Sequence, residues 1–427
     1  MPEPARDRRG WRYFSQEHAQ LVVAYAQTRE DINPILNTEM CSLRTIDWDF
    51  TGAKTSYLTH GLHPYPAKFI PQIPNALIQE LSSVGDTVGD IFCGSGTTLV
   101  EALALKRHAV GIDANPLACL ISRAKTATVG EGEADLLLAL VAKARALSDE
   151  LRCEEIPRLF PTQGLRSKGW RPDVANLNFW FMPHVIEELA EVLSWCKQIP
   201  DNSARYIALS AFSAIVVAVS NQDSDTRYVR REKGVAPGDT ARRFARSLEA
   251  TLSACVEFTD LREERFQGTV VERSLLEAPN IPVMDLMICS PPYPNAFSYH
   301  LYHMTRMLWL GMDQARFKHQ EIGSHRKYSS KGKNAATVET FREEFTSIMK
   351  WLKNHIKTGG YACFVVGDST LKGVRINNAE LISEAGRQAG FREATRIERT
   401  MQATKKSFNP AIGRIKTETI LIMQAAS

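Results

Sequence analysis

The stretch VGDIFCGSGTTLVEAL (residues 88–103) decides the fold. It has the pattern of a short apolar strand, a turn with two glycines and an amphipathic helix. Glycine lets a backbone approach a ligand closely, and the first turn of a helix offers unpaired N–H groups to a carboxylate or phosphate. The stretch therefore predicts a nucleotide-type ligand on a strand–turn–helix unit of a parallel α/β sheet.

The residues of this loop separate three classes of ligand. A P-loop requires Gly-Lys-Ser/Thr, but Gly96 is followed by two threonines, which argues strongly against it. A dinucleotide site prefers a third glycine where Leu99 stands, so that interpretation is weakened but stays open. S-adenosylmethionine fits best. The candidate cofactor-binding residues of the loop are Asp90, Phe92, Gly94, Ser95, Gly96 and Thr97.

The next apolar run, residues 109–113, ends in a carboxylate. Asp113 stands about twenty residues after the loop, where a doubly wound fold presents an acid to ribose hydroxyls. The alternative is a helix cap for the segment from Pro116 onward. Because NAD enzymes use the same acid, Asp113 predicts a ribose but not the cofactor.

A second motif follows another apolar run, residues 283–289. Here the chain continues as Ser290-Pro291-Pro292-Tyr293. The Ser290 hydroxyl and the Pro291 carbonyl can accept hydrogen bonds from an exocyclic amine, and Tyr293 can stack on a base. A strand that ends in a proline turn with a tyrosine lid is the plain structural alternative. No Gly-x-Ser-x-Gly elbow surrounds Ser290, so we interpret it as an acceptor and not as a nucleophile.

Together the glycine loop, Asp113 and the SPPY tetrapeptide resemble the N4-cytosine and N6-adenine DNA methyltransferases, and the serine form is commoner among the N4-cytosine enzymes. The resemblance includes HGLHPYPAKFIP (residues 60–71), where it implies that Lys68 and Phe69 contact the cofactor. It also includes residues 358–369, as a later strand of the same sheet. The implied fold is α/β, a Rossmann-like S-adenosylmethionine-dependent methyltransferase sheet with a mostly helical inserted domain.

The resemblance implies transfer of a methyl group from S-adenosylmethionine to the N4 amine of a cytosine flipped out of duplex DNA. An adenine-N6 enzyme, an RNA amino-methyltransferase and a catalytically silent DNA-binding subunit stay open as alternatives. The implied catalytic residues are Ser290, Pro291, Pro292 and Tyr293, with Phe297 and Tyr299 in the base pocket. Glu272 is only weakly assigned as a third cofactor contact. We expect no metal, because His300 and His303 have no matching acidic or cysteine ligands.

A long stretch between Asp113 and Ser290 indicates an insertion. We predict an N-terminal extension (residues 1–58), a cofactor-binding half (59–124), a helical insertion that is a candidate DNA-recognition region (125–265) and a catalytic half (266–427). Apolar spacing predicts helices and strands within these segments. The helices are 17–29, 134–151, 183–199 and 341–356, and the later strands are 284–289, 361–366 and 419–423.

Basic residues are clustered, although the net charge is only +4. One group lies in the predicted insertion and another follows SPPY in a Gly/Ser/Lys-rich run; a third is the pair Lys405-Lys406. Such groups can bind phosphates, and solvated surface charge is the alternative. The candidate DNA-binding residues are Arg227, Arg230, Arg231, Lys233, Arg326 and Lys327.

The composition is that of a large globular protein, with 427 residues, 44% of them hydrophobic and 23% charged. The eight cysteines form no CxxC pair, which favours reduced thiols and a cytoplasmic location. No charged-then-apolar leader opens the chain. The longest apolar stretch, residues 206–220, is expected to be a buried helix too short to cross a bilayer. Expected partners are double-stranded DNA and a restriction or defence-system protein, with no membrane.

Overall fold

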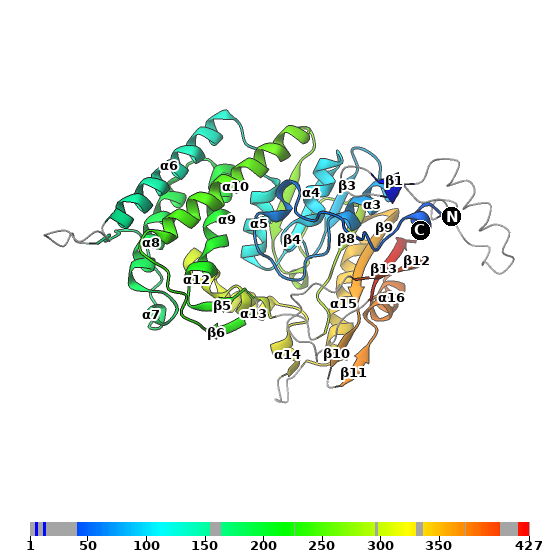
Figure 1. The fold of residues 1–427 in the computed structure, drawn as a ribbon. Helices are drawn as coiled ribbons and strands as arrows, with labels where there is room; N and C mark the ends of the chain where they lie inside the picture. Colours follow the sequence, from blue (N-terminus) through cyan, green and yellow to red (C-terminus); the bar gives the residue numbers. More distant parts are fainter. Residues whose placement is uncertain are drawn as a thin grey trace.

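A computed structural model describes residues 5–6, 12–13, 41–153, 164–225, 227–294, 298–329, 336–371, 373–401 and 417–426. Its centre is a seven-stranded sheet with the order β12-β13-β9-β8-β3-β4-β7 (Figure 1). The five strands from β9 to β7 are parallel, and β13 is antiparallel to both its neighbours. The strands are β3 (Thr87–Asp90), β4 (His108–Asp113), β7 (Gly268–Glu272), β8 (Met284–Cys289), β9 (Ile356–Gly367), β12 (Phe391–Thr400) and β13 (Thr417–Ala425).

The strand order reverses between β3 and β8. From β3 the chain builds outward through β4 to β7, and it then returns to place β8 and β9 on the other side of β3. In doubly wound sheets, ligands bind outside the carboxyl ends of the strands at this switch point. The fold therefore directs the ends of β3, β4 and β8 to one site.

Helices cover both faces of the sheet, which is why its central strands are continuously apolar. Leu286 and Ile288 of β8 pack toward α3 (Gln72–Leu81) and α4 (Thr97–Ala104). Met287 and Cys289 point to the opposite face, toward α15 (Val338–Lys353) and α16 (Asn378–Gln388). The α/β fold with a mainly parallel sheet is thus confirmed.

Four long helices between β4 and β7 share a core of their own: α6 (Glu131–Cys153), α8 (Pro183–Gln198), α9 (Asn202–Val219) and α10 (Asp239–Leu261). They lie at the opposite end of the molecule from α15 and α16 (Figure 1). α5 (Pro116–Thr126) packs against α9 and so connects this helical part to the sheet. The division of the chain into four segments stays a prediction.

The apolar helix α9 is longer than the sequence suggests. Asp201 caps it by accepting a hydrogen bond from Ala204 N, so it has 18 residues. Among the described residues it is the one helix that is long and apolar enough to cross a bilayer, which corrects the expectation that it is too short. Most of it is buried by the neighbouring helices, as expected for a core helix.

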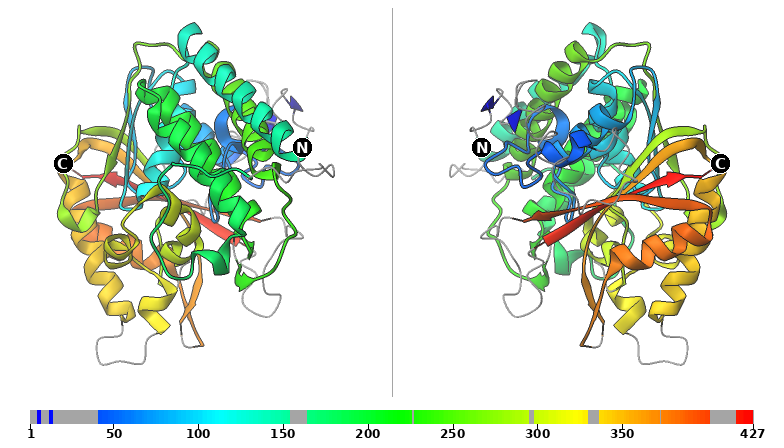
Figure 2. Two further views of the ribbon diagram at one scale, coloured as in Figure 1. Left: turned by 90° about the vertical axis from the view of Figure 1, so that its left-hand side faces the viewer. Right: turned by 90° about the vertical axis from the view of Figure 1, so that its right-hand side faces the viewer.

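Two short hairpins complete the fold. One consists of β5 (Gln222–Ser224) and β6 (Arg227–Arg230), and the other of β10 (Ser369–Leu371) and β11 (Val374–Ile376). The β10–β11 hairpin continues from the carboxyl end of β9 and lies at the lower end of the molecule (Figures 1 and 2). Neither hairpin was predicted. The helix predicted over 17–29 and the basic pair Lys405-Lys406 lie outside the described residues.

Candidate active site

The two sequence motifs line one cavity at the switch point. Its volume is about 1020 Å³, and the glycine loop, the segment after Tyr65, the end of β4 and the whole SPPY tetrapeptide contribute to its wall. Of the predicted cofactor-binding residues, those in the wall are Lys68, Phe69, Phe92, Gly94, Ser95, Thr97 and Asp113. Asp90 and Gly96 lie behind the wall.

The glycine loop is shaped by backbone conformations that side chains disfavour. Gly94 and Gly96 have φ of +48° and +77°. A Cβ on Gly96 would lie 2.8 Å from Ser122 Oγ, so the loop is packed closely onto α5. Helix α4 begins directly after Gly96 and presents its first turn at the cavity. This is the backbone arrangement that a polar ligand requires at a helix N-terminus.

Asp90 braces this loop. It is buried at the end of β3, where Oδ1 accepts a hydrogen bond from Phe92 N (3.0 Å) and Oδ2 accepts one from Thr98 Oγ1 (2.8 Å). Burial raises the pKa of Asp90 to about 7. Asp90 therefore positions the turn instead of lining the cavity.

Asp113 connects the ends of β3 and β4. Its Oδ2 accepts a hydrogen bond from Gly94 N (2.9 Å), and its Oδ1 accepts one from Asn115 N (2.8 Å). Burial raises the pKa of Asp113 to about 6. Helix α5 is capped by Asn115, which accepts from Leu117 N (3.0 Å), so the helix-cap alternative for Asp113 is wrong.

Lys68 borders the same cavity. Its ammonium donates to the carbonyl of His60 (2.7 Å), and burial lowers its pKa. His60 itself is buried against Glu101, with Nε2 2.7 Å from Oε1. His63 is also buried and contacts Ser213 Oγ (3.0 Å). Both histidines are thus held inside the fold by neighbouring polar groups.

The SPPY turn is held by a glycine that the sequence did not reveal. Gly323 has φ of +73°, and a Cβ there would lie 2.7 Å from the carbonyl oxygen of Tyr293. Burial raises the pKa of Tyr293 to about 12, so its phenol stays protonated at neutral pH. Ser290 directly follows β8, and its side chain borders the cavity.

Tyr299 lies in a stack of rings beside the SPPY turn. Its ring is 5.7 Å from that of Tyr65, which is 5.1 Å from that of His303. Glu321 accepts hydrogen bonds from the first N–H groups of α11 (Tyr299–Tyr302), and its Oε2 lies 2.6 Å from His300 Nδ1. Both histidines are buried packing residues, which corrects the surface alternative. Phe297 lies outside the described residues.

The weak assignment of Glu272 finds no support in this geometry. Its side chain is 44% exposed and lies 3.9 Å from the Arg123 guanidinium. The cavity wall here is formed by the three residues that follow it, Arg273, Ser274 and Leu275. Within the described ranges, no group of three His, Cys, Asp or Glu side chains is placed to hold a metal ion. The six described cysteines with placed side chains are all free and buried.

The predicted DNA-binding residues fall into two groups. On the β5–β6 hairpin, Arg227 and Arg231 both pair with Asp223, and Arg230 pairs with Glu232 (2.7 Å). Lys233 donates to the Val217 carbonyl at the end of α9 (2.6 Å).

The second group lies on α14 (His325–Ser329). Arg326 borders the cavity, whereas Lys327 pairs with Glu344 (2.6 Å). Lys233 and Lys327 are thus held by neighbouring groups, as is Arg230, which also donates to the Phe179 carbonyl (3.1 Å). Arg227 and Arg231 are the more exposed cations, at 61% and 73%.

Similarity to known proteins agrees with this site. The family described as DNA methylase, of the N6/N4 type, matches residues 4–124, which include the glycine loop and Asp113. Over this segment the chain is similar to the N6/N4 DNA methylase family. The Type II methyltransferase M.MvaI of Kocuria varians is 32% identical over 176 residues, which are 40% of this chain and 37% of that protein. M.MjaII of Methanocaldococcus jannaschii is 23% identical over 395 residues, covering 73% of this chain and 74% of that one.

A methyltransferase from Pyrococcus furiosus shares 9% identity over 86% of this chain and 89% of its own, with a TM-score of 0.31. Because this structural similarity is low, we assign the fold from the strand order of the sheet instead. The match to this methylase family supports S-adenosylmethionine as the cofactor. The cavity fits it, because the half-buried Asp113 carboxylate and a glycine turn at the start of α4 border the same space, and Gly96 leaves no room for a side chain.

Proposed function

We propose that this protein transfers a methyl group from S-adenosylmethionine to the exocyclic N4 amine of a cytosine flipped out of duplex DNA. One observation carries the proposal: the glycine loop with Asp113 and the SPPY tetrapeptide line the same cavity. A cofactor on the loop and an amine at SPPY would therefore meet in one enclosed space. Such proximity is a major source of rate enhancement.

The cofactor would lie between the two motifs. Each carboxylate oxygen of Asp113 accepts one backbone N–H, which leaves a lone pair on each for a ribose hydroxyl. Gly94, Ser95 and Thr97 would face the polar groups of the cofactor at the start of α4. Lys68 and Phe69 would lie at its methionine end, with Asp90 and Gly96 supporting the loop from behind.

The SPPY residues would orient the base. Ser290 Oγ and the Pro291 carbonyl would accept the amine N–H groups, Pro292 would fix the turn, and Tyr293 would stack on the ring, with Phe297 and Tyr299 completing the pocket. Bound S-adenosylmethionine supplies an electrophilic methyl group on a sulfonium. The amine lone pair forms the new N–C bond while the C–S bond breaks and its electron pair goes to sulfur. The surplus proton on nitrogen then passes to water.

The choice of base and of nucleic acid is a further part of the proposal. The serine of SPPY favours cytosine N4, and adenine N6 is the second candidate because the same acceptors suit either amine. A silent DNA-binding subunit is less favoured because both motifs are intact, and an RNA amine is less favoured because the matched family is described as a DNA methylase. The predicted DNA-binding arginines, Arg227, Arg230, Arg231 and Arg326, would contact phosphates. We infer a cytoplasmic enzyme that acts beside a restriction or defence-system partner.

The test is incubation of the purified protein with methyl-labelled S-adenosylmethionine and mixed duplex DNA, followed by nucleoside mass spectrometry. Label in N4-methylcytosine is the expected result. Label in N6-methyladenine would support a DNA methyltransferase whose target base is adenine instead of cytosine. Absence of label in DNA, with cofactor binding shown by calorimetry, would overturn the proposal and direct the search to RNA.

Replacing two SPPY side chains gives a direct check of the site. Ser290→Ala with Tyr293→Ala should abolish methyl transfer and leave the cofactor dissociation constant within about twofold, because neither side chain belongs to the glycine loop. Methylation and calorimetric binding are measured on the same preparation. Retained methylation would contradict the assignment of SPPY.

A further inference from the structure

The β10–β11 hairpin leaves the sheet at the rim of the cavity. Asp368, Ser369 and Thr370, which begin it, line the cavity wall. At its far end Gly373 has φ of +84°, and Val374 is 66% exposed. A large apolar side chain thus stands in solvent on an arm that grows out of the active site.

The base of this arm is tied to the body. Asn378 Nδ2 donates to the Gly367 carbonyl (2.7 Å), and Ser369 Oγ donates to Asn378 Oδ1 (3.3 Å). These bonds join the end of β9 to the start of α16. Across the hairpin, Arg375 Nε donates to Asp368 Oδ2 (2.7 Å). The β10–β11 hairpin is therefore anchored firmly where it leaves the sheet.

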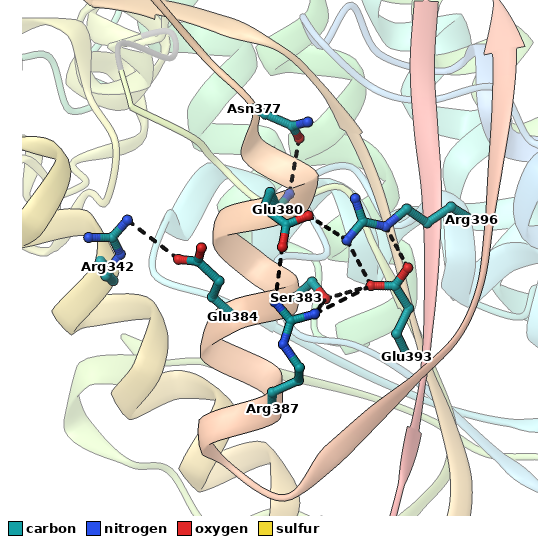
Figure 3. A network of polar contacts seen from close by, with 8 residues as sticks. All are labelled: Arg342, Asn377, Glu380, Ser383, Glu384, Arg387, Glu393 and Arg396. Carbon is teal, nitrogen blue, oxygen red and sulfur yellow. Dashed lines mark hydrogen bonds and ion pairs between the residues drawn. The ribbon is translucent and has the colours of Figure 1, made fainter.

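The helix that follows the arm is itself anchored. Asn377 caps α16 by accepting from Glu380 N, and Glu380 pairs with Arg387 (2.9 Å) and Arg396 (2.8 Å) (Figure 3). Arg396 also pairs with Glu393 (2.6 Å) on β12. These ion pairs hold α16 against β12 and so support the β10–β11 hairpin at its base.

The tip combines an apolar group with a cation. The Arg375 side chain is 79% exposed, and its contact with Asp368 uses Nε and Nη2, which leaves Nη1 for a phosphate oxygen. An exposed aliphatic side chain beside a guanidinium suits DNA, in which stacked bases lie between phosphates. Extruding a base leaves a gap in that stack, and an apolar wedge can fill it.

We infer that the β10–β11 hairpin enters duplex DNA next to the target base, with Val374 against the opened stack and Arg375 at a neighbouring phosphate. The inference rests on the proposed function. It assigns to this hairpin the task of keeping the base extruded, while SPPY holds the base once it has left the helix.

Two valines of nearly equal exposure make a matched test. Val374 is 66% exposed, and Val84, just before β3, is 60% exposed. Each is changed to Ala. The substrates are a duplex with the mapped target site and the same duplex with the target base opposite an abasic position, where little unstacking is needed. Val374→Ala should lower kcat/KM on the intact duplex by about tenfold or more and on the abasic duplex by less than about twofold.

Val84→Ala should stay within about twofold of the unaltered protein on both substrates. 2-Aminopurine at the target should show less fluorescence increase with Val374→Ala than with Val84→Ala. Equal rates for those two variants on the intact duplex would overturn the inference. If the unaltered protein binds cofactor but methylates neither duplex, the proposed function itself has failed.

Discussion

Gly323 limits the position of the SPPY turn at the scale of single residues. Gly323→Ala places a Cβ 2.7 Å from the Tyr293 carbonyl oxygen, so the turn must move. Because displacement of a catalytic group by about 1 Å can cost up to about a hundredfold, we expect kcat to fall by at least about tenfold with cofactor binding unchanged. Steady-state kinetics measure the loss.

The control for this change is Gly52→Ala. Gly52 has φ of +75°, and a Cβ there would meet no atom within 4 Å, so it shares the backbone strain without the collision. Both variants should lose about 1 kcal/mol of stability from the left-handed conformation. A similar fall in kcat in both would show that strain, and not displacement of SPPY, is responsible.

Asp113 should give cofactor binding a pH dependence. Its pKa is raised to about 6 by burial, and only the carboxylate can accept both backbone N–H groups and ribose hydroxyls. Affinity for S-adenosylmethionine should therefore weaken as pH falls through about 6. Calorimetry from about pH 5 to about pH 8 measures it. Asp113→Asn should bind more weakly and lose this acid limb; an unchanged limb would assign the titration to another group.

The same group has the opposite effect on the stability of the cofactor-free fold. The folded pKa of Asp113 lies above the ordinary value of 3.8, so folding takes up a proton. Its stabilising contribution is complete below the unfolded pKa and is lost as pH rises through about 6. Asp90 adds a loss that extends to about pH 7. Cofactor binding and folding thus respond to pH with opposite signs.

At the scale of elements, the ion pairs of α16 and β12 support the edge of the sheet. Arg396 contacts both Glu380 and Glu393 and is 30% exposed (Figure 3). Arg396→Ala should lower the free energy of unfolding by about 1 kcal/mol, and less at high salt, because partly exposed networks are screened. Chemical denaturation measures it. Arg392→Ala, which removes a contact to Gln424 on the neighbouring strand β13, should change it less.

The sequence predicted some elements better than others for physical reasons. β8 was predicted residue for residue, because a strand buried on both faces is a continuous apolar run that ends at Ser-Pro-Pro. β12 was missed, since it is an edge strand in which charged and apolar residues mix. The helix predicted over 341–356 ends at Lys353, and Ile356 starts β9.

The residues of the candidate site likewise fall into those that the sequence predicted and those that it missed. The loop, Asp113 and SPPY could be found because each follows a strand with a recognisable turn. Gly323 and Glu321 could not, because a single glycine or glutamate carries no pattern until the fold brings it to the Tyr293 backbone or the start of α11.

At the scale of the whole molecule, a buried arginine joins the helical part to the segment that follows the SPPY turn. Arg306 on α12 (Met304–Leu310) donates from Nε to the Ser213 carbonyl of α9 (3.0 Å) and pairs with Asp225 at the turn of the β5–β6 hairpin. The same short helical region carries His303 of the ring stack beside the cavity. The hairpin with its arginines is therefore fixed relative to the cavity, as a DNA-contacting element would need to be.

That arrangement predicts how the affinity of the protein for duplex DNA depends on salt concentration. Arg227 and Arg231 are 61% and 73% exposed on the hairpin, and removing one phosphate-binding side chain should reduce the slope of log Kd against log salt by about 1. Arg227→Ala with Arg231→Ala should thus lower the slope by about 2 and weaken binding for all sequences. Fluorescence anisotropy with duplex DNA at several salt concentrations measures it.

The control pair is Arg145→Ala with Arg265→Ala, whose side chains are 54% and 69% exposed beside Glu249 and Glu263. Because they are on other surfaces, they should leave the slope unchanged; equal slopes for both double variants would remove the β5–β6 hairpin from the DNA interface.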